Sequence, residues 1–85
     1  METRVAVVAV IVREGASVDA LNSLLHQYGT YIIGRMGIPY HQRGVSIISV
    51  AMDAPADVIS ALSGKLGRLP GITAKTLYAP EDALS

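Results

Sequence analysis

Apolar residues follow two kinds of pattern along this 85-residue chain. Residues 5–12 and 45–52 are rich in valine and isoleucine and are apolar at successive positions, which is typical of buried β-strands. Two further strands are predicted, one at residues 30–38, which Pro39 ends, and one at residues 72–78. Two longer segments separate the first strand from the second and the third from the fourth.

Those two segments repeat their apolar residues at helical spacing. In the first, Ser17 is a good N-cap and Gly29 a natural stop, which predicts a helix of about 12 residues. In the second, Asp53 is predicted to be the N-cap, with Pro55 in the first turn. The apolar stripe of this second helix consists of Val58, Ile59, Leu62, Leu66 and Leu69.

The predicted order is therefore strand, helix, strand, strand, helix, strand. Because crossover connections are right-handed, this order has one common solution, a four-stranded antiparallel sheet with both helices on one face. We therefore predict an α+β, ferredoxin-like βαββαβ sandwich. Its length fits a single domain spanning residues 1–85.

One face of such a sheet has no helix over it, and a soluble monomer would make that face polar. Here the strands do not alternate: Val5, Val7 and Ile11 point one way while other valines point the opposite way. An exposed apolar face usually marks an interface, so we predict a homo-oligomer, a dimer or a tetramer. The alternative is a strand that tolerates a few surface valines. The predicted interface residues are Tyr31, Ile33, Val45 and Ile47.

Charge and cysteine content narrow the classes of function. Seven basic and seven acidic residues cancel, and affinity for nucleic acid comes largely from phosphate neutralisation, so we expect no direct nucleic-acid binding. The absence of cysteine excludes disulfides and thiolate metal sites. The apolar run at residues 5–12 is shorter than the roughly 20 residues that cross a bilayer, so we expect no membrane association and a cytoplasmic location.

The segment Gly34–Gly44, GRMGIPYHQRG, has the highest density of functional side chains. The guanidinium groups of arginine can donate paired hydrogen bonds to a carboxylate or phosphate, and glycines let the backbone approach a ligand closely. A tyrosine adds a flat aromatic surface with a polar hydroxyl. We therefore predict a site for a small anionic ligand or an acidic protein partner. Its residues are Gly34, Arg35, Gly37, Tyr40, His41 and Arg43. Strand alternation would put Arg35 on the same face as Tyr31 and Ile33. In the alternative reading the glycines shape a bulge and the arginines solvate an edge strand.

No catalytic constellation is visible. There is no G-x-S-x-G elbow, and the glycines at 34 and 37 lack the third glycine of a dinucleotide fingerprint. Gly64 and Gly67 fall near the end of the second helix and are interpreted as helix–sheet packing and helix termination. With two histidines and no carboxylate at ligand spacing, we predict no metal, no cofactor and no enzymatic activity. A metal site to which each subunit donates one or two ligands is the alternative that stays open.

Three motifs together resemble a known family. They are YIIGRMGIPY at residues 31–40, VSIISV at 45–50 and SGKLGRLPGI at 63–72, and they resemble the regulators of the iron-only hydrogenase system over nearly the whole chain. The chain is also similar to ACT domains and to the C-terminal domain of nickel-responsive repressors, although it lacks the cysteine of the repressors' metal site. The resemblance implies a regulatory, ACT-like domain that works as an oligomer.

Three functions stay open at this point. The leading hypothesis is a ligand-sensing regulatory module. The second is a protein-binding assembly factor in metallocofactor maturation. The third is a small enzyme of the ferredoxin-like type, which would need a pocket between helices and sheet with aromatic and acid–base residues, whereas the expected lining here is aliphatic.

Overall fold

The computed structural model describes residues 2–80, and its element order confirms the predicted βαββαβ plan. The strands and helices are β1 (Arg4–Arg13), α1 (Val18–Gln27), β2 (Ile32–Tyr40), β3 (Val45–Ala54), α2 (Ala56–Gly67) and β4 (Ile72–Tyr78). Two short 3₁₀ turns, η1 (Gly29–Tyr31) and η2 (His41–Arg43), precede and follow β2.

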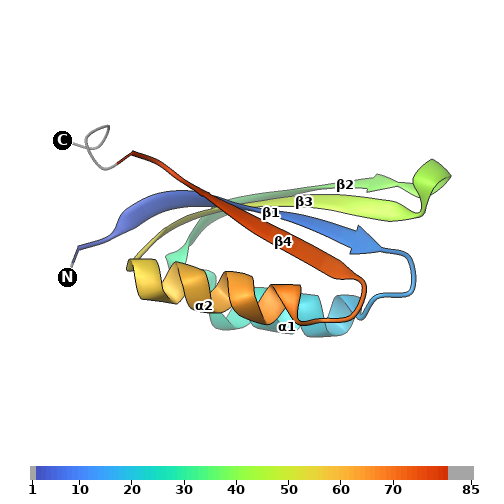
Figure 1. Ribbon diagram of the computed structural model, residues 1–85, viewed down its shortest axis with the longest axis horizontal. Helices are drawn as coiled ribbons and strands as arrows, with labels where there is room; N and C mark the ends of the chain where they lie inside the picture. Colours follow the sequence, from blue (N-terminus) through green and yellow to red (C-terminus); the bar gives the residue numbers. More distant parts are fainter. Residues whose placement is uncertain (1, 81–85) are drawn as a thin grey trace.

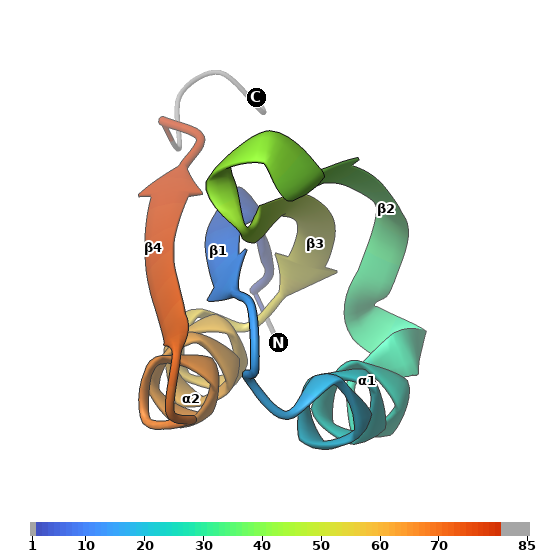
Figure 2. The same ribbon diagram turned by 90° about the vertical axis from the view of Figure 1, so that its right-hand side faces the viewer.

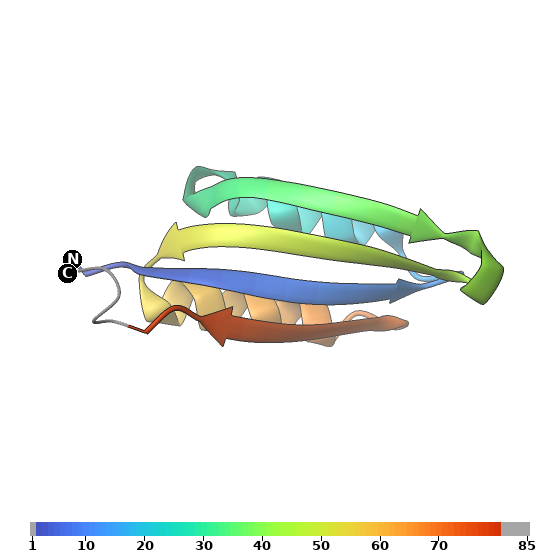
Figure 3. The ribbon, with the colours of Figure 1, turned by 90° about the horizontal axis from the view of Figure 1, so that it is seen from above.

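The four strands form one antiparallel sheet in the order β2-β3-β1-β4. Both helices lie against the same face, α2 on the side of β4 and α1 on the side of β2 (Figures 1 and 2). Seen from above, neither of the two described helices lies on the other face, and the β2–β3 hairpin extends beyond the ends of the helices (Figure 3). The predicted α+β ferredoxin-like fold is therefore confirmed.

Alternation along the two central strands separates the sheet faces. In β1 every second residue from Ala6 to Val12 is buried, and the residues opposite them in β3 are buried or half-buried. These residues pack with both helices and the start of β4 in a core that contains no buried polar residue among those described. Each fully buried aliphatic side chain contributes about 1.5–3 kcal/mol, so this single layer between sheet and helices supplies most of the stability. Its largest fully buried members are Leu21, Met52, Ile59, Leu62 and Leu66.

Strand β2 differs from its prediction at both ends. It begins at Ile32, because Thr30 and Tyr31 belong to η1, and it continues through Pro39, which pairs with Ser46. The prediction that Pro39 ends the strand was wrong because β2 lies at the edge of the sheet, where a residue without an N–H is tolerated. The register shifts between Ile32 and Gly34, so the bulge that the glycines suggested is present.

The predicted cap of the second helix was also wrong. Asp53 is a strand residue paired with Val5, and β3 continues to Ala54. Pro55 occupies the N-cap position without a side-chain hydrogen bond, and it provides an extended backbone that leads from strand to helix. The long pairing of β1 with β3 outweighs the capping preference of aspartate, because it adds backbone hydrogen bonds that one cap cannot replace.

The start of α1 follows the predicted capping chemistry. The Ala20 N–H donates to the Ser17 Oγ at 3.3 Å, and Asp19 lies in the first turn. The helix ends at Gln27, and the Tyr28 N–H closes its last turn by donating to Leu24. This cap anchors the loop that joins β1 to α1.

We expect Ser17→Ala to lower the free energy of unfolding by about 1 kcal/mol, because it removes the acceptor for a first-turn N–H. Ser23→Ala is the matched control: Ser23 is exposed within α1, so its replacement should be neutral or slightly stabilising. Urea unfolding at one fixed protein concentration measures both. Equal effects of the two variants would contradict the capping role.

Candidate functional site

The uncovered side of the sheet is a continuous apolar surface. We call it the open face, and its exposed apolar residues are Val7, Ile11, Met36, Ile38, Tyr40, Ile47 and Leu77. Register brings Ile38, Ile47 and Ile11 directly opposite one another on three neighbouring strands. A row of isoleucines therefore crosses the sheet from β2 to β1, toward Thr73 on β4.

A parallel row on the open face is built from small residues. Ser49 lies opposite Ala9 on one side and Met36 on the other, and Ala51 lies opposite Val7 and Gly34. The small side chains leave a shallow hollow of about 220 Å³ on β2 and β3, which we call the β2 hollow. On the open face a row of isoleucines therefore lies beside the β2 hollow, and a second surface of complementary shape can pack against both.

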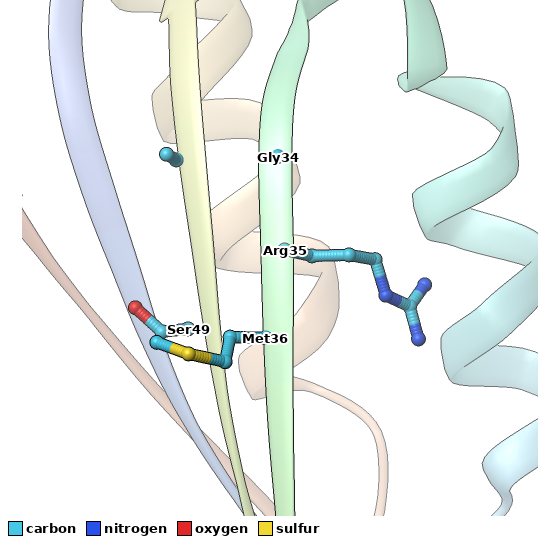
Figure 4. Close-up of a pocket in the computed structure, with 5 residues that line it drawn as sticks. Gly34, Arg35, Met36 and Ser49 are labelled. Carbon is cyan, nitrogen blue, oxygen red and sulfur yellow. The ribbon is translucent and has the colours of Figure 1, made fainter.

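Arg35 lines the β2 hollow through its position on the strand, but its side chain leaves the open face. Figure 4 shows the guanidinium pointing toward α1, away from Met36 and Ser49. There the Arg35 Nη2 donates to the Asn22 Oδ1 at 3.2 Å. Arg35 pairs with the buried Val50 and so belongs to the helix side of β2.

The expectation that Arg35 shares a sheet face with Tyr31 and Ile33 was wrong. Tyr31 lies in η1, outside the strand, and Ile33 is the extra residue of the bulge. A bulge shifts the alternation by one position, so a count across it assigns the faces incorrectly. Tyr31 and Ile33 are 37% and 65% exposed and lie at the sheet edge, whereas Val45 and Ile47 belong to the open face.

A second hollow lies where the β2–β3 hairpin meets the loop after β1. We call it the hairpin hollow; its volume is about 340 Å³, and it is open to solvent. It is lined by Val12, Arg13, Glu14, Gly15, Ala16, Val18, His41, Gly44, Val45 and Ser46. The Glu14 N–H donates to the Gly44 carbonyl at 2.7 Å, which ties the loop to the hairpin. The hollow thus combines an aliphatic floor with an imidazole, a carboxylate and a guanidinium.

The structure separates the residues predicted to form one anion site. His41 lines the hairpin hollow, Arg43 lies beside it in η2, Tyr40 is on the open face, and Arg35 is held by α1. Sequence reasoning missed Arg13, Glu14 and Ser46 as neighbours of His41. The available signal was Gly15 directly after the first strand, which marks a loop there but does not show what that loop contacts.

Comparison with known proteins identifies the family. Residues 4–76 match a family model described as "TM1266-like: Iron-only hydrogenase system regulator, putative". This chain belongs to the TM1266-like family. A search of curated proteins finds no match.

A solved structure supports the same assignment. The uncharacterized protein TM1266 from Thermotoga maritima shares 31% sequence identity with this chain, and the alignment covers 93% of this chain and 100% of that one with a TM-score of 0.89. The resemblance read from the three sequence motifs is therefore confirmed. The family description names a regulator of the iron-only hydrogenase system, and this is the level of function to which the comparison extends.

Two further findings concern the described residues of this TM1266-like protein. Within residues 2–80, no three histidine, cysteine, aspartate or glutamate side chains gather closely enough to hold a metal ion. In the same part of the chain, neither helix is long and apolar enough to cross a membrane.

We expect Gly44→Ala to lower the free energy of unfolding by about 1–2 kcal/mol, because Gly44 has a φ of +64° in the left-handed region. The added Cβ would also lie 3.1 Å from the Glu14 Oε2, which disturbs the hairpin hollow. Gly29→Ala is the control, since Gly29 has no positive φ and no atom within 4 Å of an added Cβ. Urea unfolding should separate the two, and equal values would contradict this account of the hairpin.

Proposed function

We propose that this TM1266-like protein is a regulatory module that works as a homo-oligomer through its open face and senses a small anionic ligand at the hairpin hollow. The observation that carries the proposal is the continuous row of isoleucines on a sheet face without helices. The family description supports the regulatory role.

The open face is large enough for a second copy of the chain. Its seven exposed apolar side chains range from 36% to 74% exposed, and at roughly 200 Å² for a fully exposed side chain they present roughly 700 Å². A stable interface buries about 800 Å² on each partner, and monomers rarely leave an apolar patch of this size in water.

The charges on the open face also favour self-association. Arg13 and Lys75 lie on this face together with Asp53, so it carries both signs at its periphery. In a two-fold arrangement each copy offers the same residues, and opposite charges can meet without another partner. The apolar centre with a charged rim is the usual anatomy of an interface.

The hairpin hollow supports a sensing role. Its volume lies within the range of small-molecule sites, and His41 and Arg13 supply donors for an anion. The hairpin that carries His41 also carries Ile38 and Ile47 on the open face. A ligand that holds the hairpin against the loop after β1 therefore alters the surface used for assembly, which links ligand binding to oligomerisation.

We expect the wild-type chain to have a mass at least twice the 8.9 kDa of one copy in solution. Ile47→Lys should lower that mass by half or more, because it places a charge in the centre of the apolar row. Size-exclusion chromatography with light scattering measures the masses. Gln27→Lys, exposed on α1, is the control and should leave the mass unchanged. A wild-type protein that runs as a single copy would contradict the proposal.

We expect one small carboxylate or inorganic phosphate to raise the melting temperature of the wild type. The stabilisation should reach about 2.7 kcal/mol at a ligand concentration one hundred times Kd. The rise should vanish in His41→Ala and persist in His26→Ala, since His26 lies on α1 and does not line the hollow. Persistence of the rise in His41→Ala would place the ligand elsewhere. Capture of a different protein by the open face would favour the assembly-factor hypothesis.

A further inference from the structure

The two edges of the sheet differ in how they are protected. The outer strand β2 contains Pro39, two glycines and the bulge at Ile33, and all of these interrupt regular pairing with another strand. The opposite outer strand, β4, runs for seven residues without proline, glycine or a register shift. Of the two edges, only β4 keeps a regular backbone.

Hydrogen bonds at both ends of the β1–β4 ladder show which groups of β4 point outward. The Arg13 N–H donates to the Gly71 carbonyl at 2.8 Å, and the Ala79 N–H donates to the Val5 carbonyl at 2.9 Å. Because backbone groups alternate in an antiparallel ladder, odd-numbered residues of β4 face β1. Ala74 and Thr76 therefore direct their N–H and C=O groups to the free edge, where they can pair with a further strand.

A hollow runs beside this free edge. Its volume is about 480 Å³, and we call it the edge hollow. It is lined by Ser60, Ser63, Gly64, Ala74, Lys75, Thr76 and Tyr78, which come from α2 and β4. The side of α2 next to the edge is thus made of small residues, whereas its opposite side carries Lys65, which donates to the hydroxyl of Tyr28, directly after α1.

The two glycines of α2 differ in position: Gly67 is the last residue of the helix, where helix termination was predicted, whereas Gly64 lies inside it. An added Cβ at Gly67 would meet nothing within 4 Å, and at Gly64 it would meet only the end of the flexible Arg68 side chain at 3.8 Å. Neither residue has a positive φ. The interpretation of Gly64 as a helix–sheet packing residue was therefore wrong. A glycine inside a helix is about 1 kcal/mol less favourable than alanine, and a close contact with a second chain would account for Gly64 at this position.

From these observations we infer that the edge formed by β4 and α2 is a second self-association surface, at which β4 pairs antiparallel with β4 of another copy. The two four-stranded sheets then form one continuous eight-stranded sheet. The side of α2 that carries Ser60, Ser63 and Gly64 then packs against the same side of α2 in the second copy. Gly64 allows the backbones of these two helices to approach each other closely.

Lys75 restricts the register of this pairing. A two-fold axis through Lys75 would set the two lysines directly opposite each other, where like charges are destabilising. Because the N–H and C=O groups of Ala74 and Thr76 point outward, the two-fold axis between the two β4 strands can also pass through Ala74 or through Thr76. These registers place Lys75 opposite Thr73 or Leu77 of the partner, so the pair forms without facing charges.

A second copy is the occupant that these features favour. An antiparallel strand edge is its own complement across a two-fold axis, and so is a helix side made of serine and glycine. Another strand-bearing protein would need its own matching small surface beside the added strand. The inference is independent of the open face, which lies on a different side of the sheet (Figure 3).

The test compares masses in solution by light scattering at one protein concentration. Gly64→Gln should halve the wild-type mass, because a long side chain keeps the two α2 helices apart while glutamine favours the helix. Ser60→Gln tests the same surface independently. Ala61→Gln is the matched control, since Ala61 is exposed on the same helix but does not line the edge hollow. Far-UV circular dichroism confirms that each variant is folded.

Combination with Ile47→Lys separates this inference from the proposed function. If both surfaces assemble, each single variant halves the mass and the double variant runs at 8.9 kDa. If Ile47→Lys lowers the mass and both glutamine variants at the edge hollow leave it unchanged, the edge inference is wrong and the proposed function stands. If only the edge variants lower it, the open face is wrong and the edge stands. An equal loss in Ala61→Gln overturns the edge inference.

Discussion

The structure depends on one constraint: two helices cover one face of a four-stranded sheet, and both faces of the central strands are apolar. The helix side buries valines, isoleucines and leucines in a core without polar residues among those described. The same strands place Ile11 and Ile47 on the other side, where no helix within residues 2–80 covers them. The stability of the single copy and the self-association that we propose thus rest on the same two strands.

The sequence was a good guide where alternation is regular. The β-branched runs of β1 and β3 and the apolar stripes of the helices predicted the fold and assigned Val7 and Ile47 to a face opposite the buried valines. It was a poor guide at β2, because an edge strand with a bulge follows neither the period of two nor the usual effect of proline. The prediction that Asp53 caps the second helix was wrong for a related reason, since pairing with β1 outweighs a local preference for capping.

The candidate site shows why neighbours in sequence are not neighbours in function. Arg35 and Tyr40 project from opposite sides of one strand, and His41 turns toward a loop some 26 residues earlier in the chain, at Gly15. Only the register of β1 with β3 brings that loop to the hairpin. A pattern in one sequence does not contain this register, although it does contain the glycines and charged residues that later meet.

The difference between the two sheet edges explains how assembly could end. A pair through the open face has its two-fold axis parallel to the sheet, whereas an antiparallel β4 pair has its axis perpendicular to it. Perpendicular two-fold axes that intersect combine into a closed tetramer, and in that arrangement both proposed surfaces are satisfied at four copies. The remaining outer strand, β2, carries Pro39 and the bulge at Ile33. An unprotected edge there would let sheets add without limit, so the features that made β2 hard to predict would also keep the proposed assembly finite.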